Sequence, residues 1–470
     1  MPIEFSKKLS STNTPIPGVV IYDLPVHGDN RGWFKENWQR EKMLDLGLPD
    51  FKPVQNNISF NEKKGTTRGI HAEPWDKFIS VASGKIFGAW VDLRQGPTFG
   101  AVFTATLDPS QAIYIPRGIG NAFQTLEDNT AYTYLVNDHW SAQAQEQYTF
   151  LNLADETAAI DWPISLSQAE LSEKDKAHPR LSEVSPMAPK MTLVLGANGQ
   201  LGKALRAEFA SDPAVEFAGR SEFDLNSEES FESRDWKSYA TIINAAAYTA
   251  VDAAETPEGR RTAWQTNVSA VARLARLAID HDLTLVNISS DYVFDGVQES
   301  HSEEEAFSPL SVYGQSKAAG DAVVSVVPKH YTLRTSWVIG EGNNFVRTMA
   351  SLAERGVEPA VVNDQVGRLT FAEDIAAAIR HLLESRANYG TYNVSNDGTP
   401  LSWADIAACV YETVGASPES ISGVSTEAYF RDKLAAPRPK NSTLSLDKLQ
   451  QADFETVPFQ RRLEKYLKNG

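Results

Sequence analysis

The sequence predicts two unlike domains, an all-β sandwich or barrel followed by an α/β domain built on a parallel sheet. Two observations lead to this prediction. Before about residue 187, short runs rich in β-branched and aromatic residues alternate with turn residues. After it, apolar runs alternate with helical stretches, which is typical of a doubly wound parallel sheet. The 470 residues accommodate both, since a domain usually takes roughly 150 residues.

Four runs carry strands expected in the first domain. In chain order they are FISVASGKIFGAWVDLR (78–94), FGAVFTATLD (99–108), QAIYIPRG (111–118) and TAYTYLVNDHW (130–140). Gly, Pro and Asn between such runs favour turns. Residues 171–190 are polar and contain several prolines, which is typical of a linker. We therefore expect domains at 1–180 and 191–470, joined by a linker over 181–190.

The second domain begins with an apolar run, a glycine turn and a helical period over residues 191–210. Gly196, Gly199 and Gly202 have the spacing G-x-x-G-x-x-G. Glycine lets the backbone approach a pyrophosphate, and the free N–H groups of a helix N-terminus attract it. A tight turn without a ligand is the alternative. Further apolar runs at 241–255 and 283–294 enclose a helical stretch at 267–281.

The second strand of this domain is expected to end near VEFAG (215–219), just before Arg220. An acidic residue there would bind a ribose hydroxyl, whereas an arginine can bind the 2′-phosphate of NADP. Arg220 therefore favours NADPH, with NADH as the alternative. Asp224 follows and could face the adenine end. The alternative for Arg220 is a solvated loop charge.

Tyr313 and Lys317 are four residues apart, so they share one face of a helix. A nearby ammonium lowers the pKa of a phenol, and we expect Tyr313 to titrate closer to neutrality and to protonate a developing alkoxide. Ser290 ends an expected strand at the carboxyl edge, where it can hydrogen-bond the same oxygen. An exposed helix pair is the alternative for Tyr313 and Lys317.

Polar residues gather unexpectedly in the β domain. His71 lies beside Arg68 in TTRGIHAEP, on an expected strand. A structural histidine is the commoner case, but this one has a cationic neighbour. Tyr134 lies on another alternating strand, where a core or interface tyrosine is the alternative. The other members of this polar set are Arg31, Glu36, Gln55, Asn57 and Lys77.

Charge and cysteine content exclude several classes of protein. The net charge of -17 makes nucleic acid or anionic lipid improbable as the main partner. Cys409 is the only cysteine, so no intramolecular disulfide and no cysteine-based zinc site is expected. The N-terminus lacks an apolar signal segment, and no run approaches the roughly 18 apolar residues of a membrane span. A cytoplasmic location is the expectation.

The motifs GANGQLG, NAAAYTAVDAAE, SSDYVFDG, VYGQSKAAGD, LRTSWVIGEGNNF, VNDQVGR and PRPKNSTL resemble those of dTDP-4-dehydrorhamnose reductase over about residues 191–470. That family is an extended short-chain dehydrogenase/reductase with a Rossmann fold, which reduces the C4 ketone of a nucleotide sugar. The resemblance implies catalytic roles for Ser290, Tyr313 and Lys317. It implies cofactor contacts at Gly196, Asn198, Gly199, Gln200, Leu201, Gly202, Ala246, Ala247 and Tyr248, and substrate contacts at Asp291, Tyr292, Trp337, Arg438 and Asn441. Some members hold Mg²⁺ at a glutamate where Ala204 stands here, so we expect no metal.

The first domain resembles dTDP-4-dehydrorhamnose 3,5-epimerase, a cupin-like jelly roll, over about residues 15–180. DNRGWFKENW, VQNNISFNEKKGTTRGIH, KFISVASGKIFGAWVDLR, IYIPRG, TYLVNDHW and LSEKD carry the resemblance. It implies that His71 is a general base oriented by Asp175 and that Tyr134 is the acid on the opposite sugar face. It places substrate contacts at Arg31, Glu36, Gln55, Asn57, Arg68, Lys77, Asn121 and Lys174. Two positions depart from the family: Glu73 replaces a glutamine, and Asn121 replaces a histidine and cannot titrate.

Together the two resemblances imply one bifunctional enzyme for the last two steps to dTDP-L-rhamnose. Its substrate would be a nucleotide sugar, its cofactor NADPH, and a homodimer is a further expectation. One alternative is a related enzyme that inverts only C3 or uses a UDP-sugar. The other is a non-catalytic regulatory protein that binds NADP or a sugar nucleotide.

Overall fold

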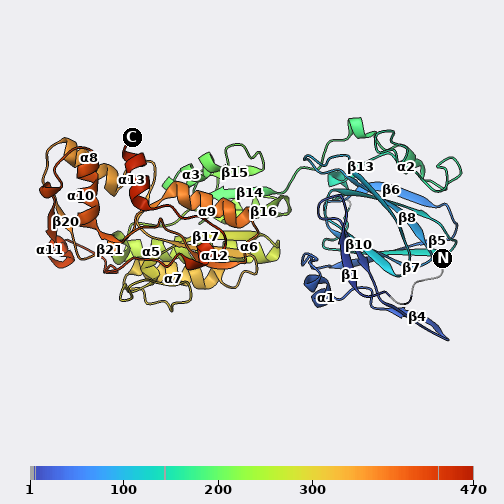
Figure 1. The fold of residues 1–470 in the computed structure, drawn as a ribbon, viewed down its shortest axis with the longest axis horizontal. Helices are drawn as coiled ribbons and strands as arrows, with labels where there is room; N and C mark the ends of the chain where they lie inside the picture. Colours follow the sequence, from blue (N-terminus) through green and yellow to red (C-terminus); the bar gives the residue numbers. More distant parts are fainter. Residues whose placement is uncertain (1–4, 6, 142–143, 432, 469–470) are drawn as a thin grey trace. The chain divides into compact units, whose positions relative to one another are not determined.

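The computed structural model describes residues 5, 7–141, 144–431 and 433–468, and the chain divides into two compact units at residues 1–189 and 190–470 (Figure 1). The first unit is rich in β-sheet. The second alternates strands and helices.

Two antiparallel sheets form the first unit. One has the order β1 (Ser10–Asn13), β2 (Val20–Asp23), β10 (Gln111–Ile115), β7 (Lys77–Ser83), β12 (Thr130–Val136) and β5 (Gln55–Asn61). The other has the order β13 (Thr149–Phe150), β6 (Thr67–Ala72), β11 (Ile119–Thr125), β8 (Ile86–Asp92) and β9 (Val102–Leu107). A separate hairpin joins β3 (Val26–Asp29) to β4 (Gly32–Lys35), and two short helices are α1 (Arg40–Asp45) and α2 (Glu173–Lys176).

The core of this unit lies between the two sheets. Ile79 and Ile113 from one sheet pack with Trp90 and Phe123 from the other, all buried. Strand β7 is buried on both faces, because Phe78 on its outer side packs under α1. This explains why residues 77–81 are all buried rather than alternately buried and exposed.

The expected linker is in part packed structure. Leu181 and Met187 are buried in the first unit against Ile70 and Val91. The backbone N–H of Met187 donates to the carbonyl of Leu93 at 2.8 Å. Apolar side chains between the prolines therefore hold residues 181–187 on the β unit, and the division between the units falls at 189/190.

A six-stranded, wholly parallel sheet forms the centre of the second unit. Its order is β15 (Val215–Ala218), β14 (Met191–Leu195), β16 (Tyr239–Asn244), β17 (Thr284–Ser290), β18 (His330–Thr335) and β23 (Gly390–Asn393). The chain reverses its direction across the sheet at β14. The loops that follow β14 and β16 therefore diverge and leave a crevice at the carboxyl edge, where such sheets bind ligands.

Helices cover both faces of this sheet. Helix α6 (Ala270–Asp280) and the end of α7 (Val312–Val324) pack on one face, and α3 (Gln200–Glu208) and α9 (Ala372–Glu384) pack on the other. The remaining helices are α4 (Glu228–Glu232), α5 (Pro257–Trp264), α8 (Phe345–Glu354), α10 (Trp403–Thr413), α11 (Thr426–Phe430), α12 (Asp447–Gln451) and α13 (Phe459–Lys468).

A further apolar core joins α8, α10 and α13 around Tyr411 and Phe459. Short strand pairs border it: β19 (Val338–Ile339) with β22 (Thr370–Phe371), β20 (Ala360–Val362) with β25 (Ser422–Val424), and β21 (Val366–Gly367) with β24 (Leu401–Ser402). No helix within the described ranges has both the length and the apolarity that crossing a membrane requires.

Candidate active sites

The first unit contains a cavity of about 720 Å³ lined by strands of both sheets. Strands β5, β6, β7, β11 and β12 contribute to its wall, and the segment 170–175 closes one side. Six of the predicted site residues line it: Arg68, His71, Lys77, Asn121, Tyr134 and Asp175. The topology therefore brings together residues that are up to about a hundred positions apart in sequence.

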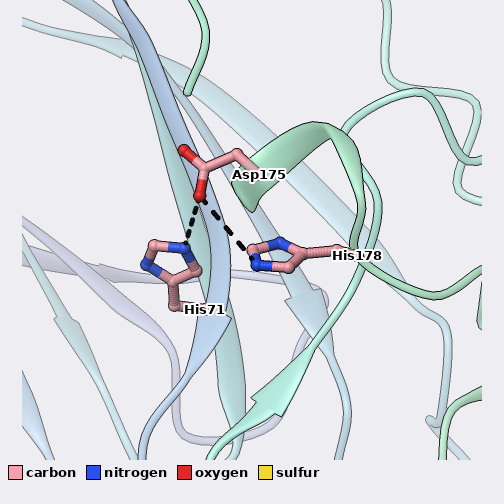
Figure 2. A group of neighbouring side chains, drawn as sticks. All are labelled: His71, Asp175 and His178. Atoms are coloured by element: carbon pink, nitrogen blue, oxygen red, sulfur yellow. Dashed lines mark hydrogen bonds and ion pairs between the residues drawn. The ribbon is translucent and has the colours of Figure 1, made fainter. Parts of the chain in front are cut away.

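His71 and Asp175 form a hydrogen-bonded pair in this cavity. His71 Nε2 lies 3.1 Å from Asp175 Oδ1, and Figure 2 shows the carboxylate above the ring. The hydroxyl of Ser172 caps α2 by accepting from the backbone N–H of Asp175 at 3.0 Å, which fixes the carboxylate. Burial alone would raise the pKa of Asp175, but the hydrogen bond and charge of His71 outweigh it and hold that pKa below its ordinary value. Asp175 is thus a carboxylate that can orient the imidazole.

Tyr134 lies across a different strand and keeps its proton. Burial and the neighbouring Glu73 carboxylate raise the pKa of Tyr134 to about 12, against an opposing effect of Arg68. Lys77 Nζ stands 5.2 Å from the centre of the Tyr134 ring. A protonated phenol beside an ammonium can donate a proton to a carbanion whose oxygen the cation stabilises.

Glu73 makes contacts that the sequence did not reveal. Its carboxylate lies 2.6 Å from Lys77 Nζ and accepts a hydrogen bond of 2.6 Å from the Trp75 indole. Lys77 and Glu73 are 5% and 11% exposed, so they form a buried ion pair in the cavity wall. The one sign of this ion pair in the sequence was that Glu73 stands where the epimerase family has a neutral glutamine.

Asn121 is held by its neighbours. Its side-chain oxygen accepts from the Trp90 indole at 3.0 Å and from the Tyr132 hydroxyl at 3.2 Å. Arg68 donates from Nε to Asn61 at 3.0 Å. With the oxygen of Asn121 engaged, its amide group is the part left to meet a ligand.

Five predicted substrate residues do not line the cavity. Arg31 is 84% exposed and pairs with Asp29, and Glu36 pairs with Lys42 in solvent, because both belong to the projecting segment around β4. Gln55 and Asn57 lie on edge strand β5 and bond to each other, with Asn57 opposite Tyr134. Lys174 lies over the ring of Phe150.

His178 was missed by the sequence analysis. It follows Asp175 by three residues, its Nε2 lies 4.0 Å from Asp175 Oδ1, and its ring contacts that of His71 at a centroid distance of 5.3 Å (Figure 2). Burial and the proximity of His71 lower the pKa of His178, which favours its neutral form. A second histidine one turn beyond the LSEKD motif was the available signal.

The second unit has a cavity of about 670 Å³ at the crevice beside β14 and β16. Its wall includes the loop after β14, the loop after β16, the end of β17 and one face of α7. The predicted residues that line it are Gly196, Asn198, Gly199, Gln200, Leu201, Arg220, Ala246, Ala247, Ser290, Asp291, Tyr292, Tyr313, Lys317 and Trp337.

The glycine loop leaves no space for a side chain at its first and third glycines. A Cβ on Gly196, which has φ of +77°, would come within 2.7 Å of the backbone nitrogen of Ala246. A Cβ on Gly202 would come within 2.2 Å of the carbonyl of Gly196. Gly202 therefore does not line the cavity but lets α3 pack against the loop. The backbone around Gly199 stays open at the helix N-terminus, which fits a pyrophosphate.

Tyr313 and Lys317 lie side by side on buried turns of α7, and Lys317 Nζ donates to the carbonyl of Ile288 at 2.6 Å. The expectation of a lowered phenol pKa is wrong for this arrangement: burial raises the pKa of Tyr313, and the hydrogen bond with Ser290 opposes it only in part. Burial likewise lowers the pKa of Lys317. Burial is the largest effect on both groups, and the carboxylates of Asp291 and Asp321 raise the pKa of Tyr313 further, so Tyr313 is held as a phenol that can donate a proton.

Asp291 and Trp337 also line this cavity. Burial raises the pKa of Asp291 to about 6, although Ser442 and Ser290 lower it through hydrogen bonds. The Ser290 hydroxyl donates to Asp291 at 3.0 Å. Trp337 has a backbone φ of +46°, and its ring stacks on that of Trp403 with a centroid distance of 3.8 Å. A bulky residue in this conformation is strained, which is a feature of binding sites.

The other predicted residues of this unit lie beyond the cavity wall. Asp224 Oδ2 lies 3.7 Å from Nε of the exposed Arg220. Tyr248 packs behind Tyr313. Arg438 donates to the two carboxylate oxygens of Asp252 at 2.8 and 2.9 Å. Burial and the Asp291 carboxylate raise the pKa of Tyr292, and the charge of Arg438 opposes this only in part. Asn441 bonds the carbonyls of residues 298 and 299, because its amide closes that turn.

Asn267 is a site residue that the sequence analysis did not find. It is buried in a π-helical turn at Gln265–Ser269, next to α7. Its side chain accepts from the N–H of Tyr248 at 2.9 Å and donates to the hydroxyl of Ser316 at 3.0 Å. Asn267 thus ties the loop after β16 to the helix that carries Tyr313 and Lys317.

The fold and the two cavities define a two-unit protein with an acid–base pocket in a β unit and a dinucleotide-type pocket in an α/β unit. Comparison with known families makes this specific. Residues 13–183 match the model of the family dTDP-4-dehydrorhamnose 3,5-epimerase, and residues 190–470 match that of the RmlD substrate binding domain. The chain belongs to both families, one in each unit.

Individual relatives agree with this assignment. A "Protein RmlC homolog" from Streptococcus pyogenes serotype M6 is 52% identical over 37% of this chain and 90% of its own length. A dTDP-4-dehydrorhamnose reductase from Aggregatibacter actinomycetemcomitans is 37% identical over 58% of this chain and 96% of its own length. The crystal structure of dTDP-4-dehydrorhamnose reductase from Bacillus anthracis in complex with NADP is 32% identical, with a TM-score of 0.56, and covers 60% of this chain and all of that one.

Proposed function

We propose that the chain is a bifunctional enzyme of dTDP-L-rhamnose biosynthesis. Its first unit inverts C3 and C5 of dTDP-4-dehydro-6-deoxyglucose, and its second unit reduces the C4 ketone with NADPH. The observation that carries the proposal is that each unit holds its own proton-transfer set in its own cavity: His71, Asp175 and Tyr134 in one, Ser290, Tyr313 and Lys317 in the other. The two reactions follow each other, since the epimerised ketone is the substrate of the reductase.

In the first unit the C4 ketone acidifies the neighbouring C–H bonds. His71, oriented by Asp175, removes the proton, and Tyr134 returns one from the other face of the ring. The enolate oxygen formed between these steps needs a cation, which Lys77 or Arg68 supplies from the cavity wall. The neutral phenol of Tyr134 and the ionised carboxylate of Asp175 are the protonation states that these roles require.

In the second unit the glycine loop and Arg220 would hold NADPH, which supplies a hydride to C4 when bound. The absence of space for a Cβ at Gly196 and the open helix N-terminus beside Gly199 fit its pyrophosphate. Tyr313 gives its proton to the developing C4 oxygen, and Ser290 holds that oxygen. Lys317, fixed by the carbonyl of Ile288, stabilises the phenolate that forms.

We also propose a fold for each unit, a dimeric state and a location in the cell. The two antiparallel sheets support a cupin-like jelly roll over 1–180, and the switch point between β14 and β16 supports a Rossmann-type reductase over 191–470. The connection over 181–190 then begins with residues that dock on the first unit. Exposed Ile58 and Phe60 on edge strand β5, 69% and 57% exposed, support a homodimer through this unit. A single cysteine is compatible with a cytoplasmic location.

The test is NADPH consumption by the purified chain with two ketones. Wild type should oxidise NADPH with either dTDP-4-dehydro-6-deoxyglucose or the epimerised ketone. The variant His71→Ala should oxidise NADPH only with the epimerised ketone, because its reductase unit is untouched. Consumption by His71→Ala with both ketones at the wild-type rate would contradict the proposed order of reactions. A faster reaction with UDP-linked ketones would assign the enzyme to that substrate class instead.

A further inference from the structure

Three potential metal ligands converge at the wall of the epimerase cavity, which His71 and Asp175 line and His178 adjoins. The ligand atoms of His71, Asp175 and His178 all lie within 4.8 Å of one another (Figure 2). Zinc bound tetrahedrally at its usual distances of about 2.0–2.2 Å separates its ligand atoms by about 3.4 Å. Asp175 Oδ1 lies 3.1 Å from His71 Nε2 and 4.0 Å from His178 Nε2, so one distance is shorter and the other longer than the spacing of ligands around zinc. The ligand nitrogens of the two histidines lie no more than 4.8 Å apart, so rotation of the side chains has to bring them together to complete the site.

His178 supplies the independent observation that points to a ligand. It is buried, with a side chain only 6% exposed. Apart from a hydrogen bond with the backbone of Leu151, its ring nitrogens have no partner among the described residues, and Nε2 lies 4.0 Å from Asp175 Oδ1, beyond hydrogen-bond distance. Figure 2 shows Nε2 turned toward Asp175. A buried polar atom without a partner is costly, and a cation would satisfy it. The His178 ring is held in this position because it stacks on the Phe150 ring with a centroid distance of 4.7 Å.

The backbone explains why these ligands come together. Asp175 and His178 are three residues apart, at and just beyond the end of α2, and so lie on one side of the turn that Ser172 caps. His71 comes from β6, which contacts this helix. Two imidazoles and one carboxylate are a ligand set that zinc accepts, with a fourth position left for water or another ligand.

We propose that His71, Asp175 and His178 bind a divalent cation of the zinc type, and that this cation switches the epimerase off. The inhibitory effect rests on the proposed role of His71 as base. A neutral imidazole has a single lone pair. When Asp175 accepts from Nε2–H, the lone pair is on Nδ1 and can take a proton from the sugar. When the cation occupies Nε2, the ring proton moves to Nδ1 and no lone pair remains.

The same chain contains the control for this effect. The reductase cavity is in the other unit, so reduction of the epimerised ketone should continue in the presence of zinc. Zinc should stop only the exchange of sugar protons with D₂O, and excess EDTA should restore it. Such selective inhibition distinguishes the site from general damage by the metal.

The experiment titrates ZnCl₂ into the full chain and measures D₂O exchange, relative to the metal-free rate of each protein. His178→Phe keeps the stacking on Phe150 and removes the ligand, so its inhibition midpoint should rise by at least about tenfold. His139→Phe changes an exposed histidine of the same unit and should keep the wild-type midpoint. Equal midpoints in all three proteins, or no inhibition by excess zinc, would overturn the proposal.

Binding is measured separately from catalysis with Co²⁺, whose visible absorption reports imidazole and carboxylate ligands. Wild type and His139→Phe should each bind one equivalent of Co²⁺ at this site, and His178→Phe should not show the absorption of that bound ion. If the metal-free wild type exchanges no protons, the proposed function fails, and the Co²⁺ spectra still decide the metal site. Identical spectra for wild type and His178→Phe would refute the site whatever the activity.

Discussion

Replacing Asp175 by asparagine tests the link between geometry and catalysis in the β unit. The carboxylate accepts the Nε2 proton of His71 at 3.1 Å and thereby leaves the lone pair on Nδ1. An amide can donate as well as accept, so it no longer selects this tautomer. It also lacks the charge that stabilises the imidazolium. A carboxylate-to-amide change in the equivalent position of a Ser-His-Asp triad costs about 10⁴ in kcat, and we expect a loss of about 10³–10⁴ here.

The assay for this prediction is the rate at which deuterium from D₂O enters C3 and C5, followed by NMR. Glu173→Gln is the matched control, because it makes the same chemical change on the same helix at a side chain that is 89% exposed. The control should exchange at the wild-type rate. Asp175→Asn should still reduce the epimerised ketone. If it exchanges within about tenfold of wild type, Asp175 does not orient the base, and the reasoning from the 3.1 Å contact is refuted.

Three further predictions concern other parts of the two sites. Tyr313→Phe should lower ketone reduction by about 10²–10⁴ while D₂O exchange continues, as NADPH absorbance and NMR will show; loss of both activities would mean that the units do not act separately. Arg220→Ala should raise the Kd of NADPH more than that of NADH, measured by fluorescence titration, and equal changes would remove the assigned cofactor preference. Lys77→Met should destabilise the first unit by about 3–5 kcal/mol because it leaves Glu73 buried without its partner, and the double variant with Glu73→Gln should recover the melting temperature but not the exchange. Wild-type exchange in that double variant would exclude Lys77 as the enolate cation.

Residues on regular strands and helices were predictable from sequence. His71 and Tyr134 lie on strands β6 and β12, and Tyr313 and Lys317 lie on helix α7, each in an element that the local sequence predicts. The glycine turn after β14 was predictable for the same reason, since its conformation requires glycine at Gly196.

Features that depend on tertiary environment were not predictable. The pKa of Tyr313 rises because the phenol is buried, and the helical spacing to Lys317 does not reveal that burial. Arg31 and Glu36 match family motifs, but the projecting β4 segment carries them into solvent. His178 and Asn267 become site residues only because separate elements fold back on them. Each of these depends on long-range packing rather than on local pattern.

The central claim is that one chain performs both steps in order. The most direct test is one reaction of the purified protein in D₂O with dTDP-4-dehydro-6-deoxyglucose and NADPH, followed by NMR of the product. We expect dTDP-L-rhamnose that carries deuterium at C3 and C5, with one NADPH consumed per sugar. A reduced sugar without deuterium at either carbon, or a deuterated ketone that is never reduced, would contradict it.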